Sequence, residues 1–157
     1  MRRRLAYDIA FFVALLATAL AMGAALAHAL ELPNKIRLDR DAYFTVQQIY
    51  RGWNLLAGLL LVELVAIVAV IALGWRTRPV RISALVALLC LIGAQALFWS
   101  LTFPANTATS NWTVQPDNWQ TLRRQWEYSH AAGAAFQVVA MASLSYGALR
   151  QTGAVRP

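Results

Sequence analysis

Four long apolar runs constrain the fold of this chain more than any other feature. They cover residues 9–30, 53–75, 82–103 and 130–149. A helix needs roughly 20 consecutive apolar residues to cross the hydrocarbon core of a bilayer. Of the 157 residues, 59% are hydrophobic and 13% are charged, whereas an average soluble domain is roughly 25% charged. The sequence therefore predicts an all-α integral membrane protein, with residues 1–157 forming one transmembrane domain of four spans.

The first run has an alternative interpretation as a secretory signal peptide. Arginines at positions 2–4 precede it, and the stretch ALAHA offers a cleavage site after Ala29. However, the run is longer than the roughly 7 to 15 residues of a signal-peptide core, and Asp8 interrupts its start. We therefore expect the first run to be retained as a transmembrane helix.

Basic residues lie at the ends of the apolar runs. The net charge is +7, but a nucleic-acid binder needs its basic residues on one solvated face, so no nucleic-acid partner is predicted. Eight basic residues flank the runs on the side of the termini: Arg2, Arg3, Arg4, Arg76, Arg78, Arg81, Arg150 and Arg156. Six lie on the opposite side: Lys35, Arg37, Arg40, Arg51, Arg123 and Arg124. The positive-inside rule then predicts cytoplasmic N and C termini, and we expect a bacterial inner membrane.

The connections between the runs differ in length and polarity. Residues 31–52 and 104–129 are long and polar, whereas the connection between the second and third runs is a short arginine-rich turn. Short connections join antiparallel neighbours, so we predict an up-down-up-down four-helix bundle with two elaborated outer loops. Pro33 is expected to end the first helix near Leu32, because proline has no backbone N–H group. Function is expected at the elaborated end.

Two Glu–His pairs mirror each other across the chain. His28 and Glu31 are three residues apart, and Glu127 and His130 have the same separation in reverse order. Residues three apart share one face of a helix. Because the first and fourth helices run in opposite directions, the two histidines should lie at one depth and the two glutamates at a shallower one. Small residues near both histidines let membrane helices approach closely, so we expect the four side chains to converge.

The residues leave three interpretations of this convergence open. His28, Glu31, Glu127 and His130 have the ligand types that bind a transition metal, and two facing histidines can also hold a haem. Alternatively, the pairs carry out acid–base chemistry without a cofactor. The third interpretation is that each pair anchors the end of a helix through hydrogen bonds.

Three polar residues lie inside the apolar runs: Glu63, Gln95 and Gln137. An ionisable side chain at that depth costs at least a few kcal/mol and often marks a functional site or pathway. The alternative is that a protonated Glu63 hydrogen-bonds to Gln95 or Gln137 and holds the helices together.

Aromatic and cationic residues gather in the two outer segments. A belt of tryptophan and tyrosine at the level of the lipid headgroups is ordinary in membrane proteins. Arg123 and Trp126 are also spaced to form a cationic, aromatic-walled mouth just ahead of Glu127 and His130. Such a mouth suits a lipophilic aromatic or quinone-like molecule.

The chain resembles a family of small four-span membrane proteins. The stretch FPAN (Phe103–Asn106), a following tryptophan, and the pattern W-x-x-x-R-x-x-W-x-x-x-H are similar to the DUF1772, or anthrone-oxygenase-like, family. The resemblance covers nearly the whole chain. Some relatives oxidise a polyketide anthrone to an anthraquinone with molecular oxygen, so the resemblance implies oxidation of a lipophilic aromatic substrate. The matching residues are Asn106, Trp119, Arg123, Trp126 and His130.

These observations together predict an outer-facing pocket. We expect His130 as the base, Glu127 orienting it, and Arg123 holding a developing enolate oxygen. Substrate contacts are expected from Arg51, Trp53, Asn106, Trp119 and Trp126. One alternative is a haem-, metal- or quinone-binding subunit that uses His28 and His130. The other is a structural membrane protein that packs on a second copy or on a different partner.

Overall fold

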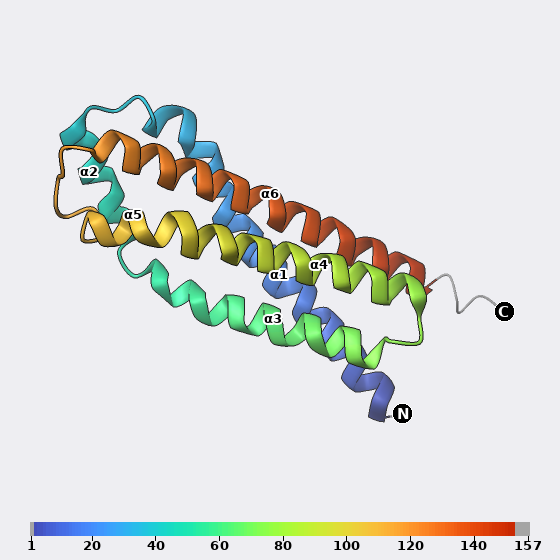
Figure 1. Cartoon of the computed structure of the whole chain (residues 1–157). Helices are drawn as coiled ribbons and strands as arrows, with labels where there is room; N and C mark the ends of the chain where they lie inside the picture. The colour runs from blue at the N-terminus through green and yellow to red at the C-terminus, as the bar shows by residue number, and fades with distance from the viewer. Residues whose placement is uncertain (1, 153–157) are drawn as a thin grey trace.

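The computed structural model describes residues 2–152, and every regular element in that range is helical. Figure 1 shows the arrangement, in which short helices connect longer ones. The longer helices are α1 (Arg2–Lys35), α3 (Leu56–Leu73), α4 (Arg78–Leu97) and α6 (Trp119–Thr152). The shorter elements are α2 (Arg40–Gln47), η1 (Gln48–Tyr50), η2 (Trp53–Leu55), the π-helical turn η3 (Phe98–Thr102) and α5 (Phe103–Ala108). The predicted all-α class is confirmed for the described residues.

Within residues 2–152, four helical stretches are long and apolar enough to cross a membrane. They are Arg2–Lys35, Trp53–Leu73, Arg78–Ala108 and Trp119–Gln151. At most 28% of the residues in the apolar window of each stretch are buried inside the protein, so most of their apolar side chains face outward. Soluble proteins rarely expose contiguous apolar surface of this kind. The helices therefore indicate an integral membrane protein, as the apolar runs predict.

The helices extend beyond most of the apolar runs that predict them. The first run corresponds to the middle of α1, and the fourth corresponds to the second half of α6. The third run continues through η3 into α5, so the helical stretch ends at Ala108 rather than at Phe103. A helix satisfies its backbone hydrogen bonds internally, so it has no need to end where its apolar residues end.

The prediction that Pro33 ends the first helix near Leu32 is wrong. Pro33 lies inside α1, which continues to Lys35. Proline removes one N–H donor and crowds the preceding turn, but only the last residues of α1 follow it. The backbone N–H of Ile36 still donates to the carbonyl of Leu32 at 3.0 Å and closes the last turn. This continuation decides where Lys35 lies.

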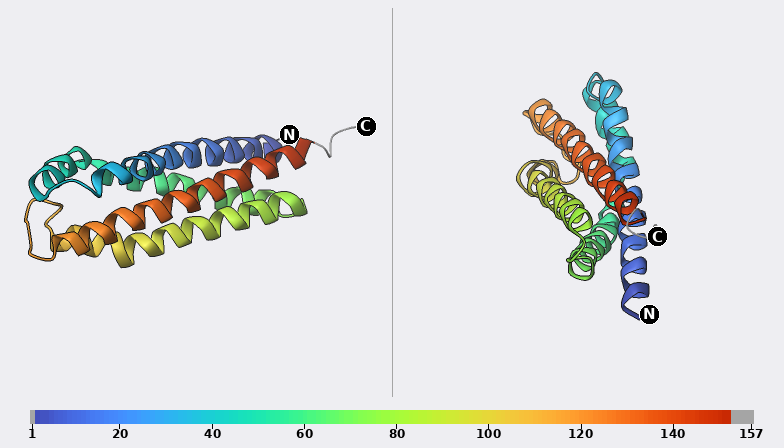
Figure 2. Two further views of the ribbon diagram at one scale, coloured as in Figure 1. Left: turned by 90° about the horizontal axis from the view of Figure 1, so that it is seen from above. Right: turned by 90° about the vertical axis from the view of Figure 1, so that its right-hand side faces the viewer.

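The long helices lie side by side along one axis, as Figures 1 and 2 show. α1 packs against α3 and α6, and α4 packs against the same two helices. Their shared core contains fully buried apolar residues, among them Ala14, Ile67, Val70, Ala84 and Leu144.

Two glycines allow α4 and α6 to approach closely. A Cβ atom on Gly93 would lie 2.9 Å from the ring of Phe136. A Cβ atom on Gly147 would lie 3.0 Å from the Cβ atom of Ser83. Small residues at such points are the usual means by which membrane helices come together.

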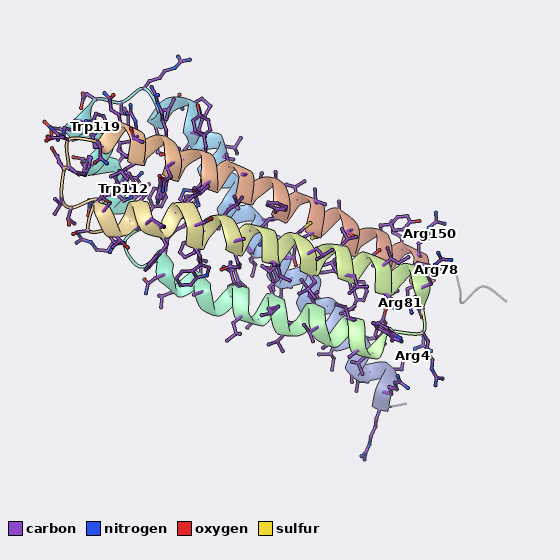
Figure 3. All side chains as sticks on the ribbon, viewed as in Figure 1. Arg4, Arg78, Arg81, Trp112, Trp119 and Arg150 are labelled. Carbon is purple, nitrogen blue, oxygen red and sulfur yellow. The ribbon has the colours of Figure 1, made fainter. Side chains whose placement is uncertain are left out.

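The two ends of the bundle differ in composition. The start of α1, the end of α6 and the connection between α3 and α4 lie at one end, and α2, α5 and the connection into α6 lie at the other. Figure 3 shows Arg4, Arg78, Arg81 and Arg150 at the first end and Trp112 and Trp119 at the second. We call these the arginine end and the aromatic end. Arg156, which also entered the charge distribution, lies outside the described residues.

Candidate functional site

A cap of aromatic residues joins α2 to α6 at the aromatic end. This aromatic cap consists of Tyr43, Phe44, Ala105, Trp112, Trp119, Leu122 and Trp126. The Asp39 side chain caps the N-terminus of α2 by accepting a hydrogen bond from the Ala42 N–H at 2.8 Å. The guanidinium of Arg123 lies 4.5 Å from the centre of the Trp119 ring and donates to the carbonyl of Leu38 at 2.7 Å. Arg123 therefore holds the segment before α2 against α6.

Asn106 fixes two tryptophans of the aromatic cap. Its side-chain oxygen accepts hydrogen bonds from the indole N–H of Trp112 at 3.1 Å and of Trp126 at 2.9 Å. Both indoles are only 4% exposed, and a buried indole N–H needs a partner. The structure thus gives Asn106, which the family resemblance implies as a site residue, a role in orienting Trp126.

His28 of α1 and His130 of α6 stack on each other beneath the cap. Their ring centroids are 4.3 Å apart and the ring planes differ by 24°. Trp126 lies 4.1 Å from His130 and 5.1 Å from His28. Tyr50 and Trp53 pack on His28 at 4.4 and 4.9 Å. We call these five residues the histidine cluster, and the prediction that the two histidines meet is confirmed.

Lys35 lies between the two glutamates of the mirrored pairs. Its ammonium is 3.2 Å from Glu127 Oε1 and 3.4 Å from Glu31 Oε2, and it donates to the Tyr50 hydroxyl at 2.7 Å. It also lies 4.9 Å from the centre of the Trp126 ring. The side chains of Lys35 and Glu127 are 5% and 0% exposed, so this ion pair is buried directly beside the histidine cluster.

Two tyrosines from the segment between α1 and α3 complete the network. Tyr43 donates to Glu127 Oε1 at 3.0 Å and accepts from the Gln47 side-chain amide. Tyr50 donates to Glu31. Burial and the neighbouring Glu127 raise the pKa of Tyr43 above its ordinary value. Burial and the hydrogen bond to Glu31 raise the pKa of Tyr50 in the same way. Both phenols therefore remain protonated donors at neutral pH.

The residues that converge here do not fit the predicted metal site. Among residues 2–152, no group of three or more His, Cys, Asp and Glu side chains is arranged to hold a metal ion. The Lys35 ammonium already lies between Glu31 and Glu127, and its positive charge would repel a second cation.

The histidine pair does not fit the predicted haem site either. Axial haem ligands each point one ring nitrogen at the iron from opposite faces of the macrocycle. The rings of His28 and His130 instead lie face to face in direct contact. No macrocycle fits between them in this arrangement.

The structure does not bring the predicted catalytic residues His130, Glu127 and Arg123 into one contact group. Glu127 contacts Lys35 and Tyr43, and no hydrogen bond to His130 is formed within the described residues. Arg123 stands over Tyr43 and Trp119 in the aromatic cap. His130 follows Arg123 by seven positions on α6, which corresponds to about 10 Å of helix rise.

The predicted substrate-binding residues are also divided. Trp53 belongs to the histidine cluster and lines a groove of about 280 Å³ together with Ala24, Gly52, Leu55 and Leu56. Trp119 belongs to the aromatic cap, whereas Trp126 belongs to both the aromatic cap and the histidine cluster. Arg51 is exposed and donates to Gln48 Oε1 at 2.9 Å.

The intramembrane polar residues form a separate contact. Glu63 is fully buried and accepts a hydrogen bond at Oε2 from Gln137 Nε2 at 3.2 Å. This confirms the predicted link between Glu63 and Gln137. Gln95 is half-buried on α4 and is not a hydrogen-bond partner of Glu63 in the described structure.

Sequence reasoning missed Lys35, Tyr43, Gln47 and Tyr50 as members of the site. A signal existed for Lys35, because it follows Glu31 by four residues and shares its helix face if the helix continues past Pro33. Tyr43 and Gln47 have the same four-residue spacing on α2. No local pattern indicates that α2 and η1 fold back onto α6.

Comparisons of the chain with protein-family models, with curated proteins and with solved structures found no match.

Proposed function

We propose that this chain is a small integral membrane protein that binds a lipophilic aromatic or quinone-like molecule at the histidine cluster and oxidises it. The observation that carries the proposal is the stacked pair of His28 and His130, walled by Tyr50, Trp53 and Trp126. Flat aromatic walls favour a flat aromatic ligand, and a neutral imidazole has a ring nitrogen that can accept a proton.

The groove beside Trp53 offers an approach to the histidines. It has a volume of about 280 Å³ and is lined by apolar side chains apart from Gly52. Ala24 lines the groove and lies four residues before His28 on the same face of α1. Leu55, at the opening, is 81% exposed. A lipophilic molecule could therefore enter from the bilayer and reach Trp53 and His28.

The buried ion pair also supports a functional site. Burying an ammonium and a carboxylate costs several kcal/mol per ion before their attraction is counted. Buried charges beside a cleft are typical of functional sites. Lys35 shares the rings of Tyr50 and Trp126 with the histidine cluster. It is therefore better placed than Arg123 to hold an oxyanion that develops there.

The reaction suggested by the anthrone-oxygenase resemblance suits this arrangement. His130 removes a proton from the acidic carbon between the rings of an anthrone, and the resulting carbanion reduces molecular oxygen. Overall, one anthrone and one O₂ give one anthraquinone and one water. His28 and Trp126, rather than Glu127, would orient the base through ring contacts.

We further propose that the bundle runs up-down-up-down with the aromatic end outward, in a bacterial inner membrane. The support is the charge distribution, since Arg4, Arg78, Arg81 and Arg150 gather at the end where α1 begins and α6 ends (Figure 3). Positive charge favours the cytoplasmic side.

The test uses the full-length protein in lipid nanodiscs. Anthraquinone binding is followed by quenching of tryptophan fluorescence, and anthrone oxidation is followed by anthraquinone absorbance, with empty nanodiscs as the blank. Trp53→Ala should weaken binding at least about tenfold, or about 1.4 kcal/mol. The matched control is Trp99→Ala, which removes an exposed tryptophan of η3.

His130→Ala should retain binding and lower the oxidation rate at least about 100-fold, the usual contribution of a general base. If wild-type protein neither binds anthraquinone nor exceeds empty nanodiscs in oxidation, the proposed function is wrong. If His130→Ala loses only stability, the cluster is a structural anchor instead.

A further inference from the structure

A second polar cluster lies deep in the bundle, apart from the histidine cluster. It contains Thr18 of α1, Glu63 of α3 and Gln137 of α6, which are 0%, 0% and 5% exposed. Gln137 follows His130 by seven residues on α6, a separation of about 10 Å along the helix axis. The proposed function does not use these three residues.

Hydrogen bonding in this cluster is incomplete. One bond is formed, from Gln137 Nε2 to Glu63 Oε2 at 3.2 Å. Three buried oxygens have no hydrogen-bond partner among the described residues: Thr18 Oγ1, Glu63 Oε1 and Gln137 Oε1. The Thr18 hydroxyl adjoins the Glu63 carboxyl without making a bond of ordinary geometry. An unsatisfied buried polar atom costs about 1–3 kcal/mol, so the cluster lacks at least one donor.

Among residues 2–152, no positive side chain forms an ion pair with Glu63. The buried ionisable groups of α1 and α6, namely His28, Lys35, Arg123 and Glu127, belong to the contacts at the aromatic end, as does His130. Tyr7, near the start of α1, donates to Gln151. Cys90 of α4 packs in the apolar core. One turn from Glu63 and Thr18, Ile67 and Ala14 are fully buried and apolar. An ionised carboxylate here would be an unpaired charge inside the bilayer.

We infer that Thr18, Glu63 and Gln137 form an intramembrane proton-binding site. A proton taken up from water on Glu63 Oε1 forms one O–H bond and breaks none in the protein. It removes the charge and supplies the missing donor to Gln137 Oε1 or Thr18 Oγ1. A metal cation is a poorer occupant, because hard cations such as Ca²⁺ and Mg²⁺ take about six or more oxygen ligands.

The first experiment is infrared difference spectroscopy of the full chain in nanodiscs at neutral pH. The wild-type spectrum should contain the carbonyl stretch of a protonated carboxylic acid, and Glu63→Gln should lose that band. Glutamine has the shape of the protonated acid and its amide supplies the same donor, so the variant should fold. The matched control is Asp41→Asn on α2, outside the spans, which should leave the band unchanged. An unchanged band in Glu63→Gln would overturn the inference.

The second experiment is labelling with a hydrophobic carbodiimide, which adds to a protonated carboxylic acid and rearranges to a stable N-acylurea. Mass spectrometry of the peptide should show Glu63 labelled, with less labelling as the pH rises. Protection by sodium chloride but not by choline chloride would instead identify a sodium site and overturn the proton assignment. Neither readout involves the histidine cluster, so this inference and the proposed function can fail independently.

Discussion

Replacing Lys35 tests whether the buried ion pair organises the aromatic end. In Lys35→Met, Glu127 keeps the hydrogen bond from Tyr43 at 3.0 Å and loses the ammonium at 3.2 Å. The Tyr50 hydroxyl also loses its donor. Methionine is close to lysine in length and apolar volume, so the perturbation is mainly the loss of charge.

The magnitude follows from the burial of the two carboxylates. Glu127 is 0% exposed, and leaving one partner of a buried ion pair unpaired costs about 3–5 kcal/mol. Glu31 is 40% exposed, so water screens its pairing with Lys35, which contributes at most about 1 kcal/mol. We therefore expect Lys35→Met to lower the free energy of unfolding by about 3–5 kcal/mol, mostly through Glu127.

Removing the other partner should reverse the effect. In Lys35→Met with Glu127→Met, no buried charge remains unpaired, and replacing buried ion pairs by apolar residues is often neutral. The double variant should therefore be more stable than Lys35→Met alone. The matched control is Arg37→Met, which removes an exposed cation two residues further along and should cost no more than about 1 kcal/mol.

The assay is reversible unfolding of the full chain in mixed micelles by increasing denaturing detergent, followed by circular dichroism and tryptophan fluorescence. The reasoning is refuted if Lys35→Met stays within about 1 kcal/mol of wild type, the range of an exposed pair. It is also refuted if the double variant is no more stable than the single one.

Two further predictions concern packing and pH. Gly93→Ala should lower the free energy of unfolding by about 1–3 kcal/mol, because the new methyl group would lie 2.9 Å from the Phe136 ring. In Gly133→Ala, the new Cβ atom meets nothing within 4 Å, so the free energy of unfolding should be unchanged or rise by up to about 1 kcal/mol. Equal effects of the two substitutions in the same assay would contradict the close contact of α4 with α6. Since the pKa of Tyr43 is raised in the folded protein, the stability from its neutral phenol is complete below about pH 10, the ordinary tyrosine value, and is lost as the pH rises toward the folded pKa. Tyr43→Phe should therefore lose less stability than wild type between neutral and strongly alkaline pH, and an identical loss in both proteins would count against the buried phenol.

The sequence predicted the histidine pair but not its neighbours. The contact between His28 and His130 could be predicted because each lies three residues from a glutamate on its helix. The prediction also assumed that the first and fourth helices are adjacent and run in opposite directions. Lys35 could not be placed in the same way, because its position depends on whether α1 continues past Pro33. The propensity of proline argues against that continuation, and the contacts of Lys35 with Glu127 and Tyr50 favour it.

The partners of Arg123 depend on the tertiary structure in the same way. Both residues lie on α6, and their spacing of seven is compatible with one helix face. The aromatic rings of Tyr43 and Trp119 surround Arg123, and Tyr43 comes from α2. Only the folding of α2 onto α6 shows which partners Arg123 meets.

The sequence by itself determined the helical class, the four long apolar helices and the depth of the two histidines. These follow from hydrophobicity and from the fixed rise and period of a helix, which act within each segment. The tertiary structure alone decided that Lys35 lies where a metal ion was predicted, that the histidine rings stack, and that Thr18 joins Glu63 and Gln137. Each of these depends on side chains from helices far apart in the chain, whose contacts are set by packing rather than by spacing.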